Sequence, residues 1–231
     1  MKFYRIDTSH MFFDRKYAYL TVNSTNKIPD NYNGPTEEYL NFKCPYCGYE
    51  EHRIFYSEKF IAVFSKDSVG DISVGAVTFQ FAFSQKVLNM IEKYQLKGIE
   101  EVRQYKYMET ARHKQIESIE SPYYDAKIHF EPLRWKYVDK ESDCLVVVQE
   151  SRTCGCSKCL GNKDYLEIPK DAKIYLDGLN NVEYDVFTTI DNFGEVFVSE
   201  RFVQACKAEK ITNILNRLVE VFDYAELPSQ L

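Results

Sequence analysis

Two short cysteine pairs are the residues of this chain best suited to do chemistry. They read Cys44-Pro-Tyr-Cys47-Gly48 and Cys156-Ser-Lys-Cys159, and 109 positions separate them (156 − 47 = 109). A CxxC turn lets two thiolates face one ion, and Zn2+ takes four such ligands in a tetrahedron. Pro pre-sets the first turn, and Gly48 tolerates a positive φ. The spacing predicts one zinc ion bound by Cys44, Cys47, Cys156 and Cys159.

Other roles for the cysteines stay open. Cys154 could replace Cys156 as a ligand, and His52 lies close enough to Cys47 to substitute for a thiolate. Independent free cysteines are a further alternative. A redox CxxC normally begins a helix and has a lowered thiol pKa, and neither pair precedes a helical pattern. Cys144 and Cys206 stand in apolar patterns, so we expect them to pack in the core.

A closed site of four thiolates does not activate water, so the predicted zinc is structural and not catalytic. The sequence contains no HExxH, GxxxxGK[ST], GxGxxG or GxSxG motif. His113 lies between charged residues and is expected to be solvated. Adjacent carboxylates such as Glu37-Glu38, Glu50-Glu51 and Glu100-Glu101 do not face each other on a helix or strand, so they are poor acid–base pairs. No catalytic residue is predicted.

The composition of the chain indicates which class of partner and which cellular compartment to expect. Lys and Arg number 29 against 35 Asp and Glu, a formal net charge of −6, which fits a basic protein partner better than nucleic acid. No apolar run has the length of a signal peptide or of a membrane span. Seven cysteines, four of them in CxxC pairs, favour metal binding in a reducing compartment over disulfides. We therefore expect a cytoplasmic protein with no membrane contact.

Strand patterns surround the cysteine pairs. Phe3 to Ile6, Tyr17 to Val22, Phe60 to Phe64, residues 71 to 83, Arg103 to Met108 and Tyr124 to Phe130 are predicted strands, and residues 23 to 36 a loop. Leu145 to Val148 is wholly apolar, which predicts a central strand. Leu218 to Tyr224 fits either a helix or an edge strand.

A strand followed by a helix occurs twice. Ser84 is a predicted N-cap, and Val87, Met90, Ile91 and Tyr94 follow at helical spacing, with Gly98 placed to end the helix. Aligning Ser199 with Ser84 matches a second strand and helix to the first and sets Ile211 opposite Leu96. Such a unit adds its strand to a sheet and packs its helix back over it. The alternative is that any two strand-to-helix turns look alike.

These patterns predict an α+β fold, with a mixed or antiparallel sheet and few helices, in a single domain over residues 1–231. Within it, residues 40–60 and 150–165 form a zinc-ribbon-like module, and residues 71–108 and 186–224 are possible repeated strand–helix units. The zinc would pin two distant segments together.

The order of three segments resembles the double-CxxCG immunity proteins of bacterial polymorphic toxin systems. The matching stretches are Cys44 to Gly48, Cys154 to Gly161 and Tyr184 to Val203, followed by Lys210 to Asn213. The second pair departs from the family pattern because Leu160, and not glycine, follows Cys159. The resemblance implies a non-catalytic cytoplasmic protein that binds and blocks a cognate toxin domain, often a nuclease.

Two other functions compete with this expectation. A zinc-ribbon protein associated with nucleic acid, or with a regulatory complex, could stack bases on its 18 tyrosines, although the acidic balance opposes it. An enzyme with an undetected carboxylate or cysteine site would need an open metal position.

Overall fold

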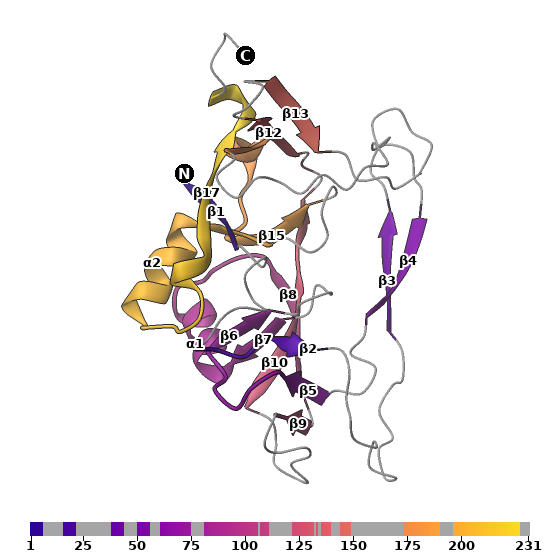
Figure 1. The fold of residues 1–231 in the computed structure, drawn as a ribbon, viewed down its shortest axis with the longest axis vertical. Helices are drawn as coiled ribbons and strands as arrows, with labels where there is room; N and C mark the ends of the chain where they lie inside the picture. Colours follow the sequence, from indigo (N-terminus) through magenta and orange to yellow (C-terminus); the bar gives the residue numbers. More distant parts are fainter. Residues whose placement is uncertain are drawn as a thin grey trace.

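β-Strands make up most of the regular structure in the computed structural model of this chain, and two α-helices, α1 and α2, complete its described part (Figure 1). The structure describes residues 1–6, 16–21, 38–43, 50–55, 61–74, 81–105, 107–110, 122–131, 133, 135–139, 144–148, 173–189 and 196–226. No helix in these ranges is long and apolar enough to cross a membrane. The predicted α+β class with a mixed sheet is confirmed.

The largest sheet has eight strands in the order β11-β15-β16-β1-β17-β14-β12-β13. Their bounds are β1 Phe3–Ile6, β11 Phe130–Glu131, β12 Trp135–Asp139, β13 Cys144–Val148, β14 Ile174–Leu176, β15 Val186–Thr189, β16 Val196–Ser199 and β17 Leu218–Asp223. The pairs β11–β15 and β14–β17 are parallel and the other pairs antiparallel. The N-terminal strand therefore lies in the middle of a sheet built mostly from the C-terminal half.

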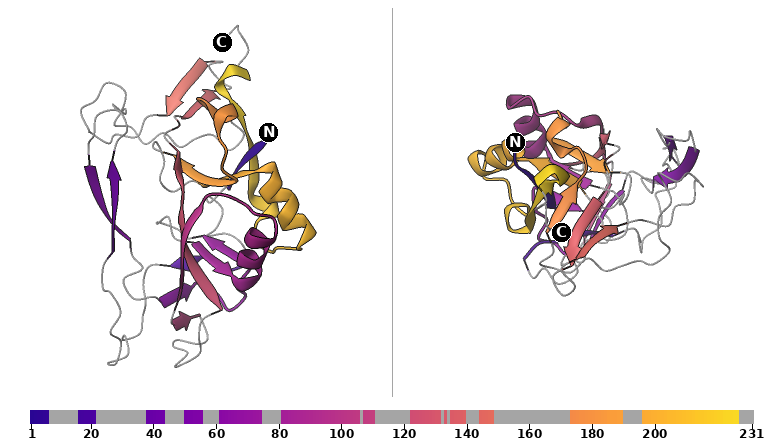
Figure 2. Two further views of the ribbon diagram at one scale, coloured as in Figure 1. Left: turned by 180° about the vertical axis from the view of Figure 1, so that it is seen from behind. Right: turned by 90° about the horizontal axis from the view of Figure 1, so that it is seen from above.

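Three smaller sheets use the remaining strands, in the orders β6-β7-β10-β8, β2-β5-β9 and β3-β4. Their bounds are β2 Leu20–Thr21, β3 Glu38–Lys43, β4 Glu50–Phe55, β5 Ile61–Phe64, β6 Ile72–Val74, β7 Phe81–Ser84, β8 Ile99–Gln104, β9 Tyr107–Glu109 and β10 Tyr123–Ile128. The four-stranded sheet is antiparallel throughout. The β3–β4 hairpin stands at the side of the molecule opposite the helices (Figures 1 and 2).

Each helix begins directly after a strand. α1 spans Gln85–Lys93 after β7, and α2 spans Glu200–Ala208 after β16. The predicted apolar stripe of α1 is confirmed, because Val87 and Met90 are buried and Ile91 and Tyr94 pack against the same core. The helices are in contact, since Lys93 Nζ lies 2.6 Å from Glu209 Oε1 just past the end of α2.

Apolar residues from both helices and both larger sheets share one core. It contains Phe81, Phe83 and Val87 from the first strand–helix unit and Val198, Phe202 and Cys206 from the second. A second cluster lies within the eight-stranded sheet around Phe3, Phe187 and Phe197. The first of these clusters joins the two sheets, because it contains buried side chains from both. Such clusters are the usual way for a domain to exclude water.

Several predicted elements are confirmed and others are wrong in extent. Phe3–Ile6 and Ile61–Phe64 are strands as expected, and the strand predicted over Tyr124 to Phe130 is divided between β10 and β11. Residues 71 to 83 contain two strands, β6 and β7, and the Arg103 to Met108 segment is divided between β8 and β9. Between Tyr17 and Val22 only Leu20–Thr21 is a described strand. The predicted loop over 23 to 36 lies outside the described residues.

The positions of two strands correct the sequence predictions. β13 contains the apolar run Leu145 to Val148, yet it stands at the end of the strand order and not at its centre. β17 is neither a helix nor an edge strand, because it pairs with β1 on one side and β14 on the other. The apolar content of a segment therefore did not predict whether its strand lies at the centre or at the edge of the sheet. For β17, the pairing depends on β1, which comes from the opposite end of the chain.

Gly98 has a different role from the one predicted. α1 ends at Lys93, and Gln95 adopts the left-handed conformation that closes it, with φ 49°. Gly98 lies beyond this turn at φ 112°, where a Cβ would stand 1.8 Å from the Val186 carbonyl oxygen. Only glycine permits this backbone approach between the strand–helix units.

Candidate functional site

The four predicted zinc ligands lie outside the described residues. Cys44 and Cys47 belong to the six-residue connection between β3 and β4, whose last described pair is Lys43 opposite Glu50. Cys156 and Cys159 lie between β13 and β14, as does the rival Cys154. His52 pairs through its backbone with Asn41, and its side chain is not described. The zinc site therefore stays a prediction.

Cys206 is a packing residue, as predicted. It is fully buried in the shared core, and burial raises the pKa of its thiol to about 12. A thiol with that pKa stays protonated at neutral pH and is a poor metal ligand. Cys144 opens β13, and its side chain is not described. Within the ranges that the structure describes, no group of three or more His, Cys, Asp or Glu residues could hold a metal ion.

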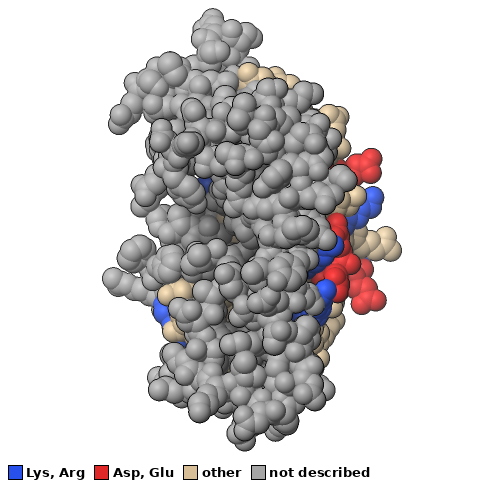
Figure 3. Space-filling model, turned by 90° about the vertical axis from the view of Figure 1, so that its right-hand side faces the viewer, with Lys and Arg blue, Asp and Glu red and all other residues tan. Residues whose placement is uncertain are grey.

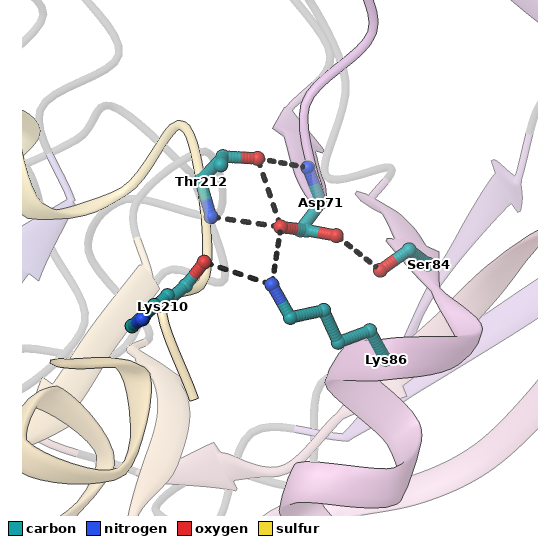
Figure 4. A network of polar contacts seen from close by, with 5 residues as sticks. All are labelled: Asp71, Ser84, Lys86, Lys210 and Thr212. Atoms are coloured by element: carbon teal, nitrogen blue, oxygen red, sulfur yellow. Dashed lines mark hydrogen bonds and ion pairs between the residues drawn. The ribbon is translucent and has the colours of Figure 1, made fainter. Parts of the chain in front are cut away.

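Asp71 is the centre of a polar junction between the two strand–helix units (Figure 4). Its Oδ2 accepts hydrogen bonds from the amide and the hydroxyl of Thr212, each at 2.9 Å. Its Oδ1 accepts a hydrogen bond from Ser84 Oγ at 2.9 Å. Ser84 occupies the predicted N-cap position, but its hydroxyl makes no cap hydrogen bond to α1. The sequence thus located the helix start correctly and missed what the serine binds.

Lys86 completes this junction from the first turn of α1. Its Nζ donates to the Lys210 carbonyl at 2.8 Å and lies 3.5 Å from Asp71 Oδ2. Partial burial tends to raise the pKa of Asp71, but the hydrogen bonds from Thr212 and Ser84, together with the charge of Lys86, outweigh it and lower that pKa. Asp71 is therefore an ionised acceptor whose oxygens already face donors from the chain.

Asp185 forms a matching junction at the start of α2. Its Oδ1 accepts a hydrogen bond from Ser199 Oγ at 2.6 Å, and its Oδ2 accepts from the Lys97 amide at 3.0 Å and from Arg201 Nη1 at 3.2 Å. Ser199 Oγ also accepts from the Phe202 amide at 3.2 Å, so here the serine does cap its helix. Asp185 and Ser199 are fully buried. Both junctions hold chain segments in place, because each carboxylate accepts hydrogen bonds from residues of a distant segment.

His129 lies where the chain passes from the four-stranded sheet to the eight-stranded sheet. Its amide donates to the Gly98 carbonyl and its carbonyl accepts from the Thr188 amide, each at 2.8 Å. Its Nδ1 lies 3.0 Å from Glu100 Oε1, and its ring stacks on Tyr184 with centroids 3.6 Å apart. Sequence reasoning left His129 without a role, because these partners come from two distant segments, residues 98–100 and 184–188.

The Glu100-Glu101 pair is exposed, and each residue is ion-paired with a neighbour. Glu100 Oε2 lies 3.1 Å from Lys127 Nζ, and Glu101 Oε1 lies 2.7 Å from Arg103. Partial burial tends to raise the pKa of Glu100, but its hydrogen bonds from Lys127 and His129 lower it overall. These carboxylates stabilise the strand surface and do not form an acid–base couple.

Asp125 is a second buried carboxyl that sequence reasoning missed. Asp125 and Ala126 are adjacent in β10 and therefore lie on opposite faces of the strand, yet both are buried. Burial raises its pKa to about 6, although a hydrogen bond from the Ala126 amide, the charge of Arg103 and a hydrogen bond with Tyr105 oppose the rise. Tyr105 is buried too, and its hydroxyl donates to the Phe81 carbonyl at 3.1 Å. A perturbed carboxyl of this kind can mark a functional site, but this one is enclosed by its own sheet.

A short signal could have located the two junctions. Asp71 and Asp185 each directly precede a strand that pairs with the strand leading into a helix. An aspartate at such a place, followed 13 or 14 residues later by a helix-start serine, is readable in the sequence. The partners Thr212 and Lys97 are not readable, because each comes from the other unit.

Figure 3 shows the side of the molecule that carries the β3–β4 hairpin. Acidic and basic side chains of described residues lie next to one another along one edge of this view. Comparison with models of known protein families and with curated proteins gives no match for this chain.

Proposed function

We propose that this chain is a non-catalytic immunity protein that binds a cognate bacterial toxin domain in the cytoplasm and neutralises it, with one structural zinc held by Cys44, Cys47, Cys156 and Cys159. The observation that carries the proposal is the order of three sequence segments: Cys44 to Gly48, then Cys154 to Gly161, then Tyr184 to Val203. This order resembles the double-CxxCG immunity proteins. The zinc-ribbon-like module over residues 40–60 and 150–165 is part of the same proposal.

The third segment has an architectural role that supports this reading. It contains Asp185, β15, β16 and the helix-start Ser199, nearly all of whose residues are buried. Residues needed to build a fold recur together whatever partner the protein binds, whereas contact residues change with the partner. The segment is thus a marker of the fold, and it names no toxin-contacting residue.

The polar clusters in the described ranges are compatible with the non-catalytic role that we propose. Asp71 and Asp185 accept several hydrogen bonds from the chain itself, and Glu100 is engaged by Lys127 and His129. A zinc ion with four thiolate ligands has no open position for water or substrate.

The partner we propose is a basic toxin domain, of which a nuclease is the expected kind. A nuclease carries positive charge to bind phosphates, and this chain has a formal net charge of −6. Opposite charges speed association and favour the correct pair. Direct binding of nucleic acid is not part of the proposal.

Co-expression tests the function. Each gene beside the one encoding this chain is expressed alone and together with it, and colony formation is counted. We expect one neighbour to be toxic alone and to be neutralised by the chain. Finding no neighbour that is toxic alone and rescued by this chain would contradict the proposal.

Purified proteins separate binding from an indirect effect on expression. The rescued toxin and the chain should form a stable 1:1 complex whose association rate falls as salt rises. Glu92→Gln, on the exposed face of α1, provides a matched control with one acidic charge removed. Salt-dependent binding of the chain itself to single-stranded DNA or RNA would instead support the nucleic-acid-associated zinc ribbon.

A further inference from the structure

Within the two strand–helix units, the stretches Phe81 to Leu96 and Val196 to Ile211 match residue for residue at a separation of 115 positions (199 − 84 = 115). α1 and α2 each have nine residues, and each closes with the same pair of hydrogen bonds. Leu96 and Ile211 donate to the carbonyls of Ile91 and Cys206, five residues back in each case. Gln95 and Lys210 hold the left-handed turn position, at φ 49° and 52°. Two non-glycine residues in this conformation at matching places are uncommon by chance.

The sheets around the helices match as well. The four-stranded sheet has the order β6-β7-β10-β8, and the eight-stranded sheet contains β15-β16-β1-β17, with the same antiparallel pairing. Tyr124 on β10 donates to Gln85 at the start of α1, and Tyr4 on β1 donates to Glu200 at the start of α2. β1 therefore takes in the second unit the place that β10 takes in the first, although it comes from the opposite end of the chain.

The match extends two strands further. β9, which follows β8 closely, pairs in parallel with β5, and β17 pairs in parallel with β14. β5 then pairs antiparallel with β2, and β14 pairs antiparallel with β12. With β8 and β9 together as the counterpart of β17, six strand positions recur in the same order and with the same directions, although the first set is divided between two sheets.

Reciprocal contacts show how the units are related. Asp71 of the first unit binds the amide of Thr212 after α2, and Asp185 of the second binds the amide of Lys97 after α1. Lys86 and Arg201, again 115 positions apart (201 − 86 = 115), lie beside these two carboxylates. Contacts in which each partner gives what it receives are the signature of a twofold axis, as in a symmetric dimer.

The strand registers place the cysteine pairs within this arrangement. Ile61 and Leu176 lie opposite Tyr107 and Asp223, so they correspond at 115 positions (176 − 61 = 115). The β12 register sets Trp135 opposite Leu176, and the β2 register, extended two positions past Thr21, sets position 23 opposite Ile61, which gives a separation of 112 positions (135 − 23 = 112). Cys44 and Cys156 are also 112 apart (156 − 44 = 112), as are Cys47 and Cys159 (159 − 47 = 112).

We infer that the chain is two copies of one unit related by an approximate twofold axis, with β1 completing the second copy, and that Cys44–Cys47 and Cys156–Cys159 are the same feature in the two copies. Cys154 corresponds to Phe42 and has no cysteine counterpart (154 − 112 = 42). A metal ion shared by equivalent segments lies on the axis that relates them and takes two thiolates from each copy. This last statement rests on the proposed zinc site; the two-copy arrangement does not.

A crystal structure of the full chain with zinc located by its anomalous signal tests both parts separately. Superposing β6, β7, α1 and β8 on β15, β16, α2 and β17 should need a rotation near 180°. The same operation should carry Cys44 and Cys47 onto Cys156 and Cys159, with zinc on its axis. A rotation far from 180°, or cysteine pairs that fail to coincide, would overturn the inference even with zinc bound. The expected superposition without zinc would support the two copies and reject the proposed metal.

Cobalt titration of two variants tests the ligand assignment. Cys154→Ser should bind one Co2+ with the intense charge-transfer absorption of four thiolates, as the wild type does. Cys156→Ser should lose at least tenfold in affinity and lose part of that absorption. The reverse pattern would overturn the correspondence between Cys44 and Cys156.

Discussion

Thr212 donates two hydrogen bonds to the carboxylate of Asp71, from its amide and from its hydroxyl, across 141 positions of sequence. This contact joins the loop after α2 to the residue directly before β6, the strand that pairs with β7. Its counterpart joins Asp185 to the Lys97 amide after α1. The two strand–helix units are thus coupled by charged hydrogen bonds at both ends of their contact, and the apolar core lies between.

Asp71→Asn should lower the free energy of unfolding by about 2 kcal/mol, because hydrogen bonds to a charged acceptor contribute roughly 1.5–3 kcal/mol. The amide keeps the shape of the carboxylate, so the loss reports charge and acceptor capacity. Urea denaturation at pH 7 measures it. Glu92→Gln on the exposed face of α1 is the control, and its change should stay within about 0.5 kcal/mol. Equal effects of the two substitutions would contradict the role given to Asp71.

Asp125→Asn should be about as stable as the wild type at pH 4 and more stable at pH 7.5. The folded-state pKa of Asp125 is raised to about 6 from 3.8, so its protonated form is the one that the fold favours. The stability that protonated Asp125 adds to the folded state is fully present below the unfolded pKa of 3.8. It is lost as the pH rises through about 6. The difference between the proteins should approach an amount on the order of 3 kcal/mol.

Unfolding free energies of both proteins at pH 4, 6 and 7.5 check this. Asp177→Asn, at an exposed turn residue, is the matched control and should show no such growth with pH. A constant difference between wild type and Asp125→Asn at all three values would show that Asp125 does not titrate as its burial implies.

Gln95→Gly and Lys210→Gly should each stabilise the chain by about 0.5–1 kcal/mol. Both residues hold the left-handed position that closes a helix, where glycine avoids the strain of a Cβ. Both are exposed, so little packing is lost. Thermal unfolding measures the gain. Gln95→Ala and Lys210→Ala are the controls, because alanine keeps the strain; stabilisation by alanine as large as by glycine would refute the explanation.

Cys47→Ser should lower stability more than Cys206→Ser. Loss of one ligand weakens the whole closed zinc site, whereas Cys206 only packs in the core. A chelator should lower the melting temperature of the wild type and of Cys206→Ser and leave that of Cys47→Ser nearly unchanged. Equal losses in the two variants would count against the metal assignment.

Local patterns predicted the elements well where one segment decides the outcome. The period of Val87, Met90, Ile91 and Tyr94 gave α1, and alternation around Ala126 gave β10. Ser84 and Ser199 marked both helix starts. The α+β class followed from the same signals.

The features that local patterns did not predict depend on contacts between segments far apart in the sequence. β17 is interior because β1 returns from the N-terminus to pair with it, and no local signal records that pairing. Gly98 was expected to end a helix because it follows the helical pattern. Its actual role was missed because the Val186 carbonyl, which excludes a side chain at Gly98, lies 88 positions away (186 − 98 = 88). The partners of Asp71, Asp185 and His129 likewise come from distant segments. The predicted cysteine ligands lie outside the described residues, so their assignment rests on the sequence alone.

Zinc analysis of protein purified under reducing conditions tests the central claim most directly. One zinc ion joining Cys44 and Cys47 to Cys156 and Cys159 predicts one zinc per wild-type chain and a marked loss in Cys47→Ser. A wild-type chain that is folded, reduced and free of zinc would contradict the claim.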